Sequence, residues 1–125
     1  MVQLTTITTS NASIPSTLPP GLIAVFIGGT SGIGEVSVKL LAKLAIKPKI
    51  YIVGRSAEAA ARIIAECRAL NAEGEYIFIQ KSLGLIREAE EFCEEFRGRE
   101  GFVNLLFLSV GSVSMESMWC FLLFL

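Results

Sequence analysis

Residues 22–34, LIAVFIGGTSGIG, join a continuous apolar run to a turn that contains four glycines. The run from Leu22 to Ile27 has the length and composition of a strand that is buried on both faces. After Gly34 the apolar side chains recur at helical spacing, so the turn lies between a strand and a helix. In a doubly wound α/β fold, such a turn holds the pyrophosphate of a dinucleotide. The stretch therefore predicts a dinucleotide-binding site.

The rest of the chain alternates strands with helices through short links. Further strands are predicted at 49–53, 75–80 and 103–108, and helices at 33–46, 57–70 and 85–97. Right-handed crossovers between the strands require a parallel sheet, most simply in the order 3-2-1-4 with helices on both faces. The predicted fold class is α/β, a truncated Rossmann-like doubly wound sheet.

Apolar side chains at helical spacing predict the buried face of each helix. Ser56 is predicted to cap the second helix. Two cysteines fall on the predicted faces, which favours buried, reduced thiols and a cytoplasmic location. The predicted faces consist of Val36, Leu40, Leu41 and Leu44, then Ile63, Ile64, Cys67 and Leu70, then Leu85, Ala89, Phe92, Cys93 and Phe96.

Composition excludes several classes of site. The chain has 125 residues and a net charge of −1, and it contains no histidine and no aspartate, so His-based triads and His-containing metal sites are excluded. No Cys-x-x-Cys pair supports a zinc knuckle, and the scattered Lys and Arg do not suggest a nucleic-acid surface. The apolar residues 118–125 are too few to span a bilayer.

Three segments are expected along the chain. Residues 1–20 are rich in Thr, Ser and Pro and are interpreted as an N-terminal leader. Residues 21–114 are expected to form an NADP-binding half-domain. Residues 115–125 are an apolar tail, and the sequence leaves open whether this tail caps the core or results from truncation.

The glycines of the turn have distinct expected roles. Gly28 permits the tight turn, Gly32 lets the backbone approach a phosphate, and Gly34 lets the helix pack on the strand. Thr30 and Ser31 add hydroxyl donors beside the amides of the helix start.

The residue about 20 positions further on, where NAD-selective sites carry an acidic side chain, is Arg55. A cation there accommodates a 2′-phosphate, so Arg55 favours NADP over NAD. The alternative, a solvated arginine at a helix start, stays open.

The motif Gly-x-x-x-Gly-Ile-Gly at 28–34, with Ile33 as its isoleucine, resembles the cofactor turn of the short-chain dehydrogenase/reductase family. Val-Gly-Arg-Ser at 53–56 resembles the members that prefer NADP. Residues 18–114 are similar to the N-terminal part of a fungal subgroup that is often associated with secondary-metabolite pathways. The resemblance covers only the cofactor-binding half of a full family member.

The sequence departs from the family pattern at three places. Ile27 stands where many members have Thr, and Ser82 stands where an Asp usually holds the adenine amino group. Ser109-Val-Gly111 replaces the usual Asn-Ala-Gly, so adenine and ribose contacts are expected to be weaker. The residues expected to contact the cofactor are Gly28, Thr30, Ser31, Gly32, Ile33, Gly34, Arg55, Ser56, Ser82, Ser109 and Gly111.

No catalytic residue is predicted. The family reaction, NADP-dependent carbonyl reduction or alcohol oxidation, uses a Tyr with a Lys four residues later. Here Tyr51 is followed at that distance by Arg55, and Tyr76 by Gln80. The resemblance implies a polyketide-like substrate for a complete member, and the isolated chain is expected to be inactive. A non-catalytic NADP-binding module and a non-functional truncated product stay open as alternatives.

The fourth predicted strand, 103–108, carries no charge and would end the sheet as an apolar edge. Such an edge invites pairing with another chain, so self-association is expected. The expected small-molecule partner is NADP(H), and a substrate is expected only with the missing half.

Overall fold

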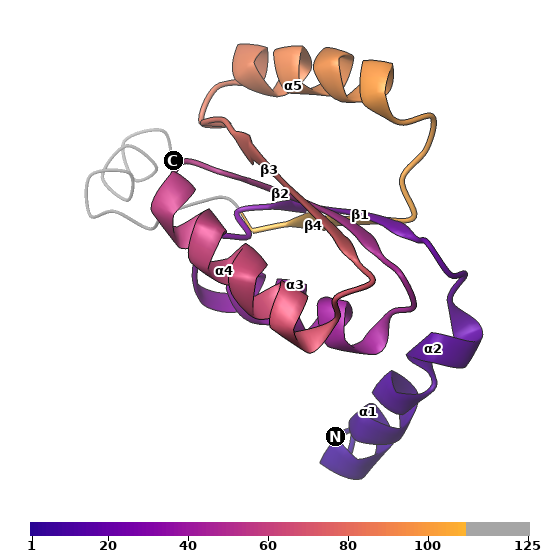
Figure 1. Cartoon of the computed structure of the whole chain (residues 1–125). Coiled ribbons are helices and arrows are strands. Elements are labelled where there is room, and N and C mark those ends of the chain that lie inside the picture. The colour runs from indigo at the N-terminus through magenta and orange to yellow at the C-terminus, as the bar shows by residue number, and fades with distance from the viewer. Residues whose placement is uncertain (110–125) are drawn as a thin grey trace.

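The computed structural model describes residues 1–109; Gly111 and the predicted tail at 115–125 lie outside the described residues. Its strands form one parallel sheet in the order β3-β2-β1-β4, which confirms the predicted topology (Figure 1). The strands are β1 (Ile23–Ile27), β2 (Lys49–Gly54), β3 (Glu75–Gln80) and β4 (Leu105–Leu108).

The described helices lie on both faces of this sheet, as predicted. Figure 1 shows α3 and α4 against one face and α5 against the other, while α1 and α2 extend away from the sheet. The helices are α1 (Leu4–Ala12), α2 (Ile14–Thr17), α3 (Gly32–Leu44), α4 (Ala57–Leu70) and α5 (Ile86–Arg99).

The core is divided by the sheet into two apolar layers. On the side of α3 and α4, Phe26 and Ile52 from the central strands pack with Ile63 of α4. On the side of α5, Tyr51 meets Phe96 edge-on, with ring centroids 4.9 Å apart. Because both faces of β1 and β2 are covered, β1 and the buried residues 50–53 of β2 form continuous buried runs rather than alternating with exposed polar residues.

The predicted buried face of α3 is partly wrong. The residues that α3 buries include Val38, Leu41 and Ala42, whereas Val36 and Leu40 are exposed. Apolar residues occur on more than one side of this helix, so the spacing alone fits two rotational settings. The predicted face residues that are exposed in the structure are Val36, Leu40, Leu70, Leu85 and Cys93.

The two described cysteines differ. Cys67 is buried against the sheet, and burial raises the pKa of its thiol to about 11, so this cysteine is an inert core residue. Cys93 is exposed, so its predicted burial is wrong. α5 presents only a narrow apolar stripe, with Phe92 and Phe96 buried, and Cys93 lies outside it.

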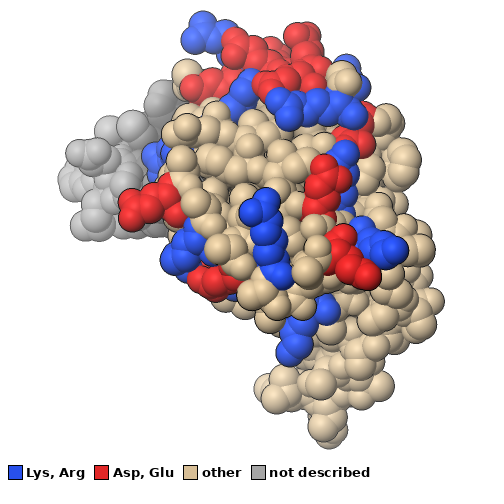
Figure 2. Space-filling view, viewed as in Figure 1, with Lys and Arg blue, Asp and Glu red and all other residues tan. Residues whose placement is uncertain are grey.

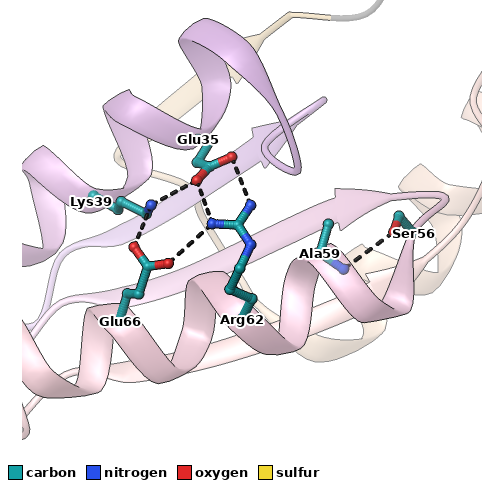
Figure 3. Close-up of polar contacts among 6 residues, drawn as sticks. All are labelled: Glu35, Lys39, Ser56, Ala59, Arg62 and Glu66. Atoms are coloured by element: carbon teal, nitrogen blue, oxygen red, sulfur yellow. Dashed lines mark hydrogen bonds and ion pairs between the residues drawn. The ribbon is translucent and has the colours of Figure 1, made fainter.

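Four charged side chains join α3 to α4 (Figure 3). Arg62 donates two hydrogen bonds to Glu35, at 2.8 and 3.1 Å, and Lys39 donates one at 2.6 Å. Glu66 pairs with both cations. The hydrogen bonds from Arg62 and then Lys39 lower the pKa of Glu35 from 4.5 to about 2, so this carboxylate stays ionised in weak acid.

The helices α1 and α2 were not predicted. Their residues are exposed, apart from a half-buried one at position 14. Residues 1–20 contain no charged side chain, and Figure 2 shows this segment as an extension without charged residues. The hydroxyls of Thr8 and Thr9 donate to the carbonyl oxygens four residues earlier, at 2.9 and 2.8 Å. These bonds pair the threonine hydroxyls within the helix, although Thr and Ser favour helices only weakly. The division of the chain at residue 20 stays a prediction.

Charges of both signs are interspersed on the surface. Figure 2 shows acidic and basic side chains mixed over α5 and beside α3 and α4 on the face in view. Within residues 1–109, no helix is both long enough and apolar enough to cross a membrane.

Candidate functional site

The glycine turn has backbone angles and close approaches that fit the expected roles. Gly28 and Gly32 have φ values of +86° and +56°, a region that residues with a β-carbon rarely adopt. A β-carbon on Gly34 would overlap the carbonyl oxygen of Gly28. The turn therefore requires glycine at all three positions, and Gly34 brings the first turn of α3 directly against the end of β1.

The N-terminus of α3 is open to a ligand. Ser31 is the N-cap residue in an extended conformation, and its side chain makes no capping hydrogen bond. A β-carbon on Gly32 would have no atom within 4 Å, so the space beside this first helical residue is free. The first amides of a helix lack intrahelical acceptors and carry partial positive charge, so they can bind an anion here.

An open cavity of about 520 Å³ lies at the carboxyl ends of the strands. This is the position at which open α/β sheets bind ligands, and the volume suits a small-molecule ligand. The cavity brings together six of the residues predicted to contact the cofactor. The lining residues are Ile27, Gly28, Thr30, Ser31, Val53, Gly54, Arg55, Lys81, Ser82, Leu83, Gly84 and Ser109.

The lining is cationic. In the part of the chain that the structure describes, its charged residues are Arg55 and Lys81, and Thr30, Ser31 and Ser82 are among those that supply hydroxyls. None of the lining residues within 1–109 carries a carboxylate. Within residues 1–109, Arg55 makes no ion pair. The donor set fits a polyanionic ligand.

The turn is fixed to the neighbouring strand. The amide of Gly28 donates to the carbonyl oxygen of Val53 at 3.0 Å, which continues the sheet pairing beyond β1. A β-carbon on Gly54 would lie 2.8 Å from Cγ2 of Thr30, so Gly54 makes room for the threonine side chain. Gly54 thus lets the glycine turn, through Thr30, pack closely against the end of β2 just before Arg55.

Four predicted residues lie outside the cavity lining. Gly32 and Gly34 act through the backbone of α3, as described above, and the side chain of Ile33 is 75% exposed. Ser56 accepts a hydrogen bond from the amide of Ala59 at 3.2 Å, which confirms that it caps α4 (Figure 3). Its hydroxyl therefore has a structural partner beside the cavity.

Lys81 is the charged residue of the cavity that the sequence did not predict. β2 and β3 pair in parallel with Gly54 opposite Gln80, so Arg55 and Lys81 are the next two residues in register. The amide of Lys81 donates to the carbonyl oxygen of Gly54 at 3.0 Å. Once the order of the strands was predicted, the residue after the third strand could have been recognised as a neighbour of Arg55.

The two tyrosines have structural partners away from the cavity. The hydroxyl of Tyr51 donates to Glu100 at 2.6 Å beneath α5, and burial raises the pKa of this phenol. Tyr76 donates to the carbonyl oxygen of Asn71 at 2.8 Å, and burial raises its pKa to about 12. Neither phenol is placed or activated for proton transfer. In the described part of the chain, no group of three potential metal ligands occurs.

Comparison with known proteins identifies fungal relatives. The chain is 45% identical over 91 residues to the oxidoreductase andH of Emericella variicolor, covering 73% of this chain and 27% of that protein. It is 32% identical over 108 residues to the short-chain dehydrogenase/reductase SAT2 of Stachybotrys chartarum, covering 74% of this chain and 30% of that protein. The chain therefore spans about a third or less of the length of these relatives. No family model matches it.

The fold is shared with solved reductases. The chain superposes with a TM-score of 0.65 on L-sorbose reductase from Gluconobacter frateurii, which was solved with NADPH and L-sorbose. The two are 18% identical, and the match covers 82% of this chain and 40% of that one.

Proposed function

The chain belongs to the short-chain dehydrogenase/reductase family, and on this premise we propose that it binds NADP(H) and forms the cofactor-binding part of an oxidoreductase. The observation that supports this most directly is the cavity at the carboxyl ends of the strands, where the described residues combine an open helix N-terminus with two cations and no carboxylate.

The phosphates, the adenine and the ribose of the nucleotide each have a proposed contact. The backbone at Gly32 and the hydroxyls of Thr30 and Ser31 bind the pyrophosphate at the start of α3. Arg55, at the end of β2, binds the 2′-phosphate that distinguishes NADP from NAD. Ser82 and Ser109 lie at the ends of the neighbouring strands, where adenine and ribose extend in this family.

Binding is tested most sharply by placing a negative charge at the mouth of the site. Ser31→Asp adds a carboxylate at the N-cap of α3, where Asp is as good a cap as Ser, so the fold should lose no stability. We expect NADPH affinity to fall at least tenfold in calorimetric titration while the melting temperature stays equal or rises. Ser10→Asp, in exposed α1, adds the same charge away from the cavity and should leave affinity unchanged. Absence of NADPH binding by the unsubstituted chain would refute the proposal.

For the chain itself we propose binding without turnover, since its sequence contains no Tyr with a Lys four residues later. The complete reaction, reduction of a carbonyl or oxidation of an alcohol, then needs further polypeptide. NADPH oxidation with simple ketones should stay at background. Turnover that survives repurification and disappears in Ser31→Asp would contradict this. NADPH binding without turnover would support a non-catalytic NADP-binding module as the function of the isolated chain.

Two further expectations belong to this proposal. The exposed β4 edge supports self-association of the chain, since two of its leucines are more than half exposed. The cytoplasmic location stays a prediction from cysteine usage, and the buried thiol of Cys67 is compatible with it.

A further inference from the structure

Lys81 lies beside Arg55 at the edge of the cavity. The register of β2 and β3 makes the two residues direct neighbours across adjacent strands, which are about 4.8 Å apart in a sheet. Their backbones are held by two hydrogen bonds, from the amide of Lys81 to Gly54 and from the Gln80 side chain to the carbonyl oxygen of Arg55. Two positively charged residues therefore lie side by side at the carboxyl ends of β2 and β3.

The charge of a phosphate monoester calls for both cations. Such a group carries about −1.5 to −2 charges at neutral pH, because its second pKa is near 6. Arg55 supplies a single positive charge, and no other described residue that lines the cavity, apart from Lys81, supplies a second. Two like charges side by side are unfavourable unless an anion lies between them.

Glu95 of α5 compensates Lys81 in the structure. The ammonium of Lys81 lies 2.8 Å from one oxygen of Glu95, and Arg99 lies 2.8 Å from the other. Glu95 therefore keeps a cationic partner when Lys81 turns towards a ligand. The side chains of Lys81 and Glu95 are partly exposed, at 26% and 37%, so the exchange leaves no charge buried without a partner.

From this geometry we propose that Lys81 is a second specificity-determining residue for NADP, which binds the 2′-phosphate together with Arg55 and is held ready by Glu95. This rests on the proposed function, since it concerns the same nucleotide site. NADH lacks the 2′-phosphate, so Lys81 contributes to NADPH binding and little to NADH binding.

The test is calorimetric titration of the whole chain with NADPH and with NADH. Lys81→Ala should lower NADPH affinity about tenfold and change NADH affinity less than twofold, as expected for one charge-assisted contact. Lys81→Arg keeps the charge and should keep most of the NADPH preference. Lys43→Ala removes an equal charge from the exposed end of α3 and should alter neither affinity.

Glu95→Gln separates recognition from a structural role. It breaks the same ion pair as Lys81→Ala but leaves the lysine in place. If Lys81 contacts the phosphate, Glu95→Gln retains or increases the NADPH preference, because a competing carboxylate is gone. If Lys81 only ties α5 to the sheet, both variants lose affinity for NADPH and NADH to the same extent, and the proposal is overturned.

The remaining outcomes are also decisive. Selective loss in Arg55→Ala without any loss in Lys81→Ala would overturn the role of Lys81 and leave the proposed function intact. Failure of the unsubstituted chain to bind either nucleotide would overturn both.

Discussion

A β-carbon on Gly34 would overlap the carbonyl oxygen of Gly28, so no side chain fits at this position between helix α3 and the end of β1. This contact sets the distance between the first turn of α3 and the sheet. It also fixes the direction in which the helix start faces the cavity.

The first prediction follows from that contact. Gly34→Ala should destabilise the chain by about 1–3 kcal/mol, because the new methyl group must displace backbone rather than a flexible side chain. Gly98→Ala, in α5, is the matched substitution, since a β-carbon there meets no atom within 4 Å. It should stabilise the chain by up to about 1 kcal/mol, because Ala favours a helix more than Gly does; the gain is smaller than in a helix interior, since Gly98 is the second-to-last residue of α5. Urea unfolding of both variants measures the difference, and equal stabilities would show that the turn relaxes without cost.

The second prediction concerns the choice between NADP and NAD. Arg55→Ala should reduce NADPH affinity about ten- to a hundredfold, because a charge-assisted hydrogen bond contributes about 1.5–3 kcal/mol. NADH affinity should change little. Arg68→Ala, at the far end of α4, removes the same charge and serves as the control. Equal losses for both nucleotides in calorimetry would remove Arg55 from the 2′-phosphate.

The fold and the family could be predicted from the sequence because their determinants are local. Apolar runs of strand length, helical spacing between them and a right-handed crossover leave few parallel arrangements, and the order β3-β2-β1-β4 is the simplest. Gly28, Gly32 and Gly34 marked the turn because each has a backbone role that other residues cannot fill.

What the sequence did not reveal depends on side-chain partners. The rotational setting of α3 is fixed by Gly34 against Gly28, whereas its apolar residues, including the exposed Val36, fit other settings. Lys81 could be recognised as a neighbour of Arg55 only once the register of β2 and β3 was known. Its ion-pair partner Glu95 lies in α5, which a loop separates from β3. The residues predicted to contact the cofactor stay predictions until binding is measured.

The third prediction is an acid dependence of stability that arises from Glu35. Its pKa is lowered to about 2 in the folded chain and is 4.5 in the unfolded chain, so the unfolded state binds the proton more readily. The stabilisation is therefore complete above pH 4.5 and is lost as the pH falls towards 2. Glu35→Gln should lower the melting temperature at pH 7 and flatten its fall between pH 4.5 and 2.

The control for this dependence is Glu58→Gln, in the exposed first turn of α4, where Glu58 makes no ion pair within residues 1–109. It should leave the steepness of the acid transition unchanged. Raised salt should reduce the difference between Glu35→Gln and the unsubstituted chain, since the network is partly exposed and is screened. An acid transition of equal steepness in all three proteins would place its origin in other carboxylates.

The last prediction concerns the edge formed by β4. Among the described residues this strand pairs only with β1, and Leu106 and Leu108, which lie opposite Val25 and Ile27 on the α5 side of the sheet, are 56% and 63% exposed. Phe107 packs on Phe26 from the other face, with ring centroids 5.3 Å apart, so the strand is held in place, and within residues 1–109 no strand pairs with its outer edge. A fixed, uncharged apolar edge can pair with a second copy of the chain.

We therefore expect the average mass in size-exclusion chromatography with light scattering to rise with concentration. Leu106→Lys should weaken this association at least tenfold, because a lysine on an edge strand opposes pairing. The control is Leu70→Lys at the end of α4, which adds the same charge away from the edge and should leave the association unchanged. A monomer at all concentrations, with a sharp cooperative melt, would show that this edge is covered in the whole chain.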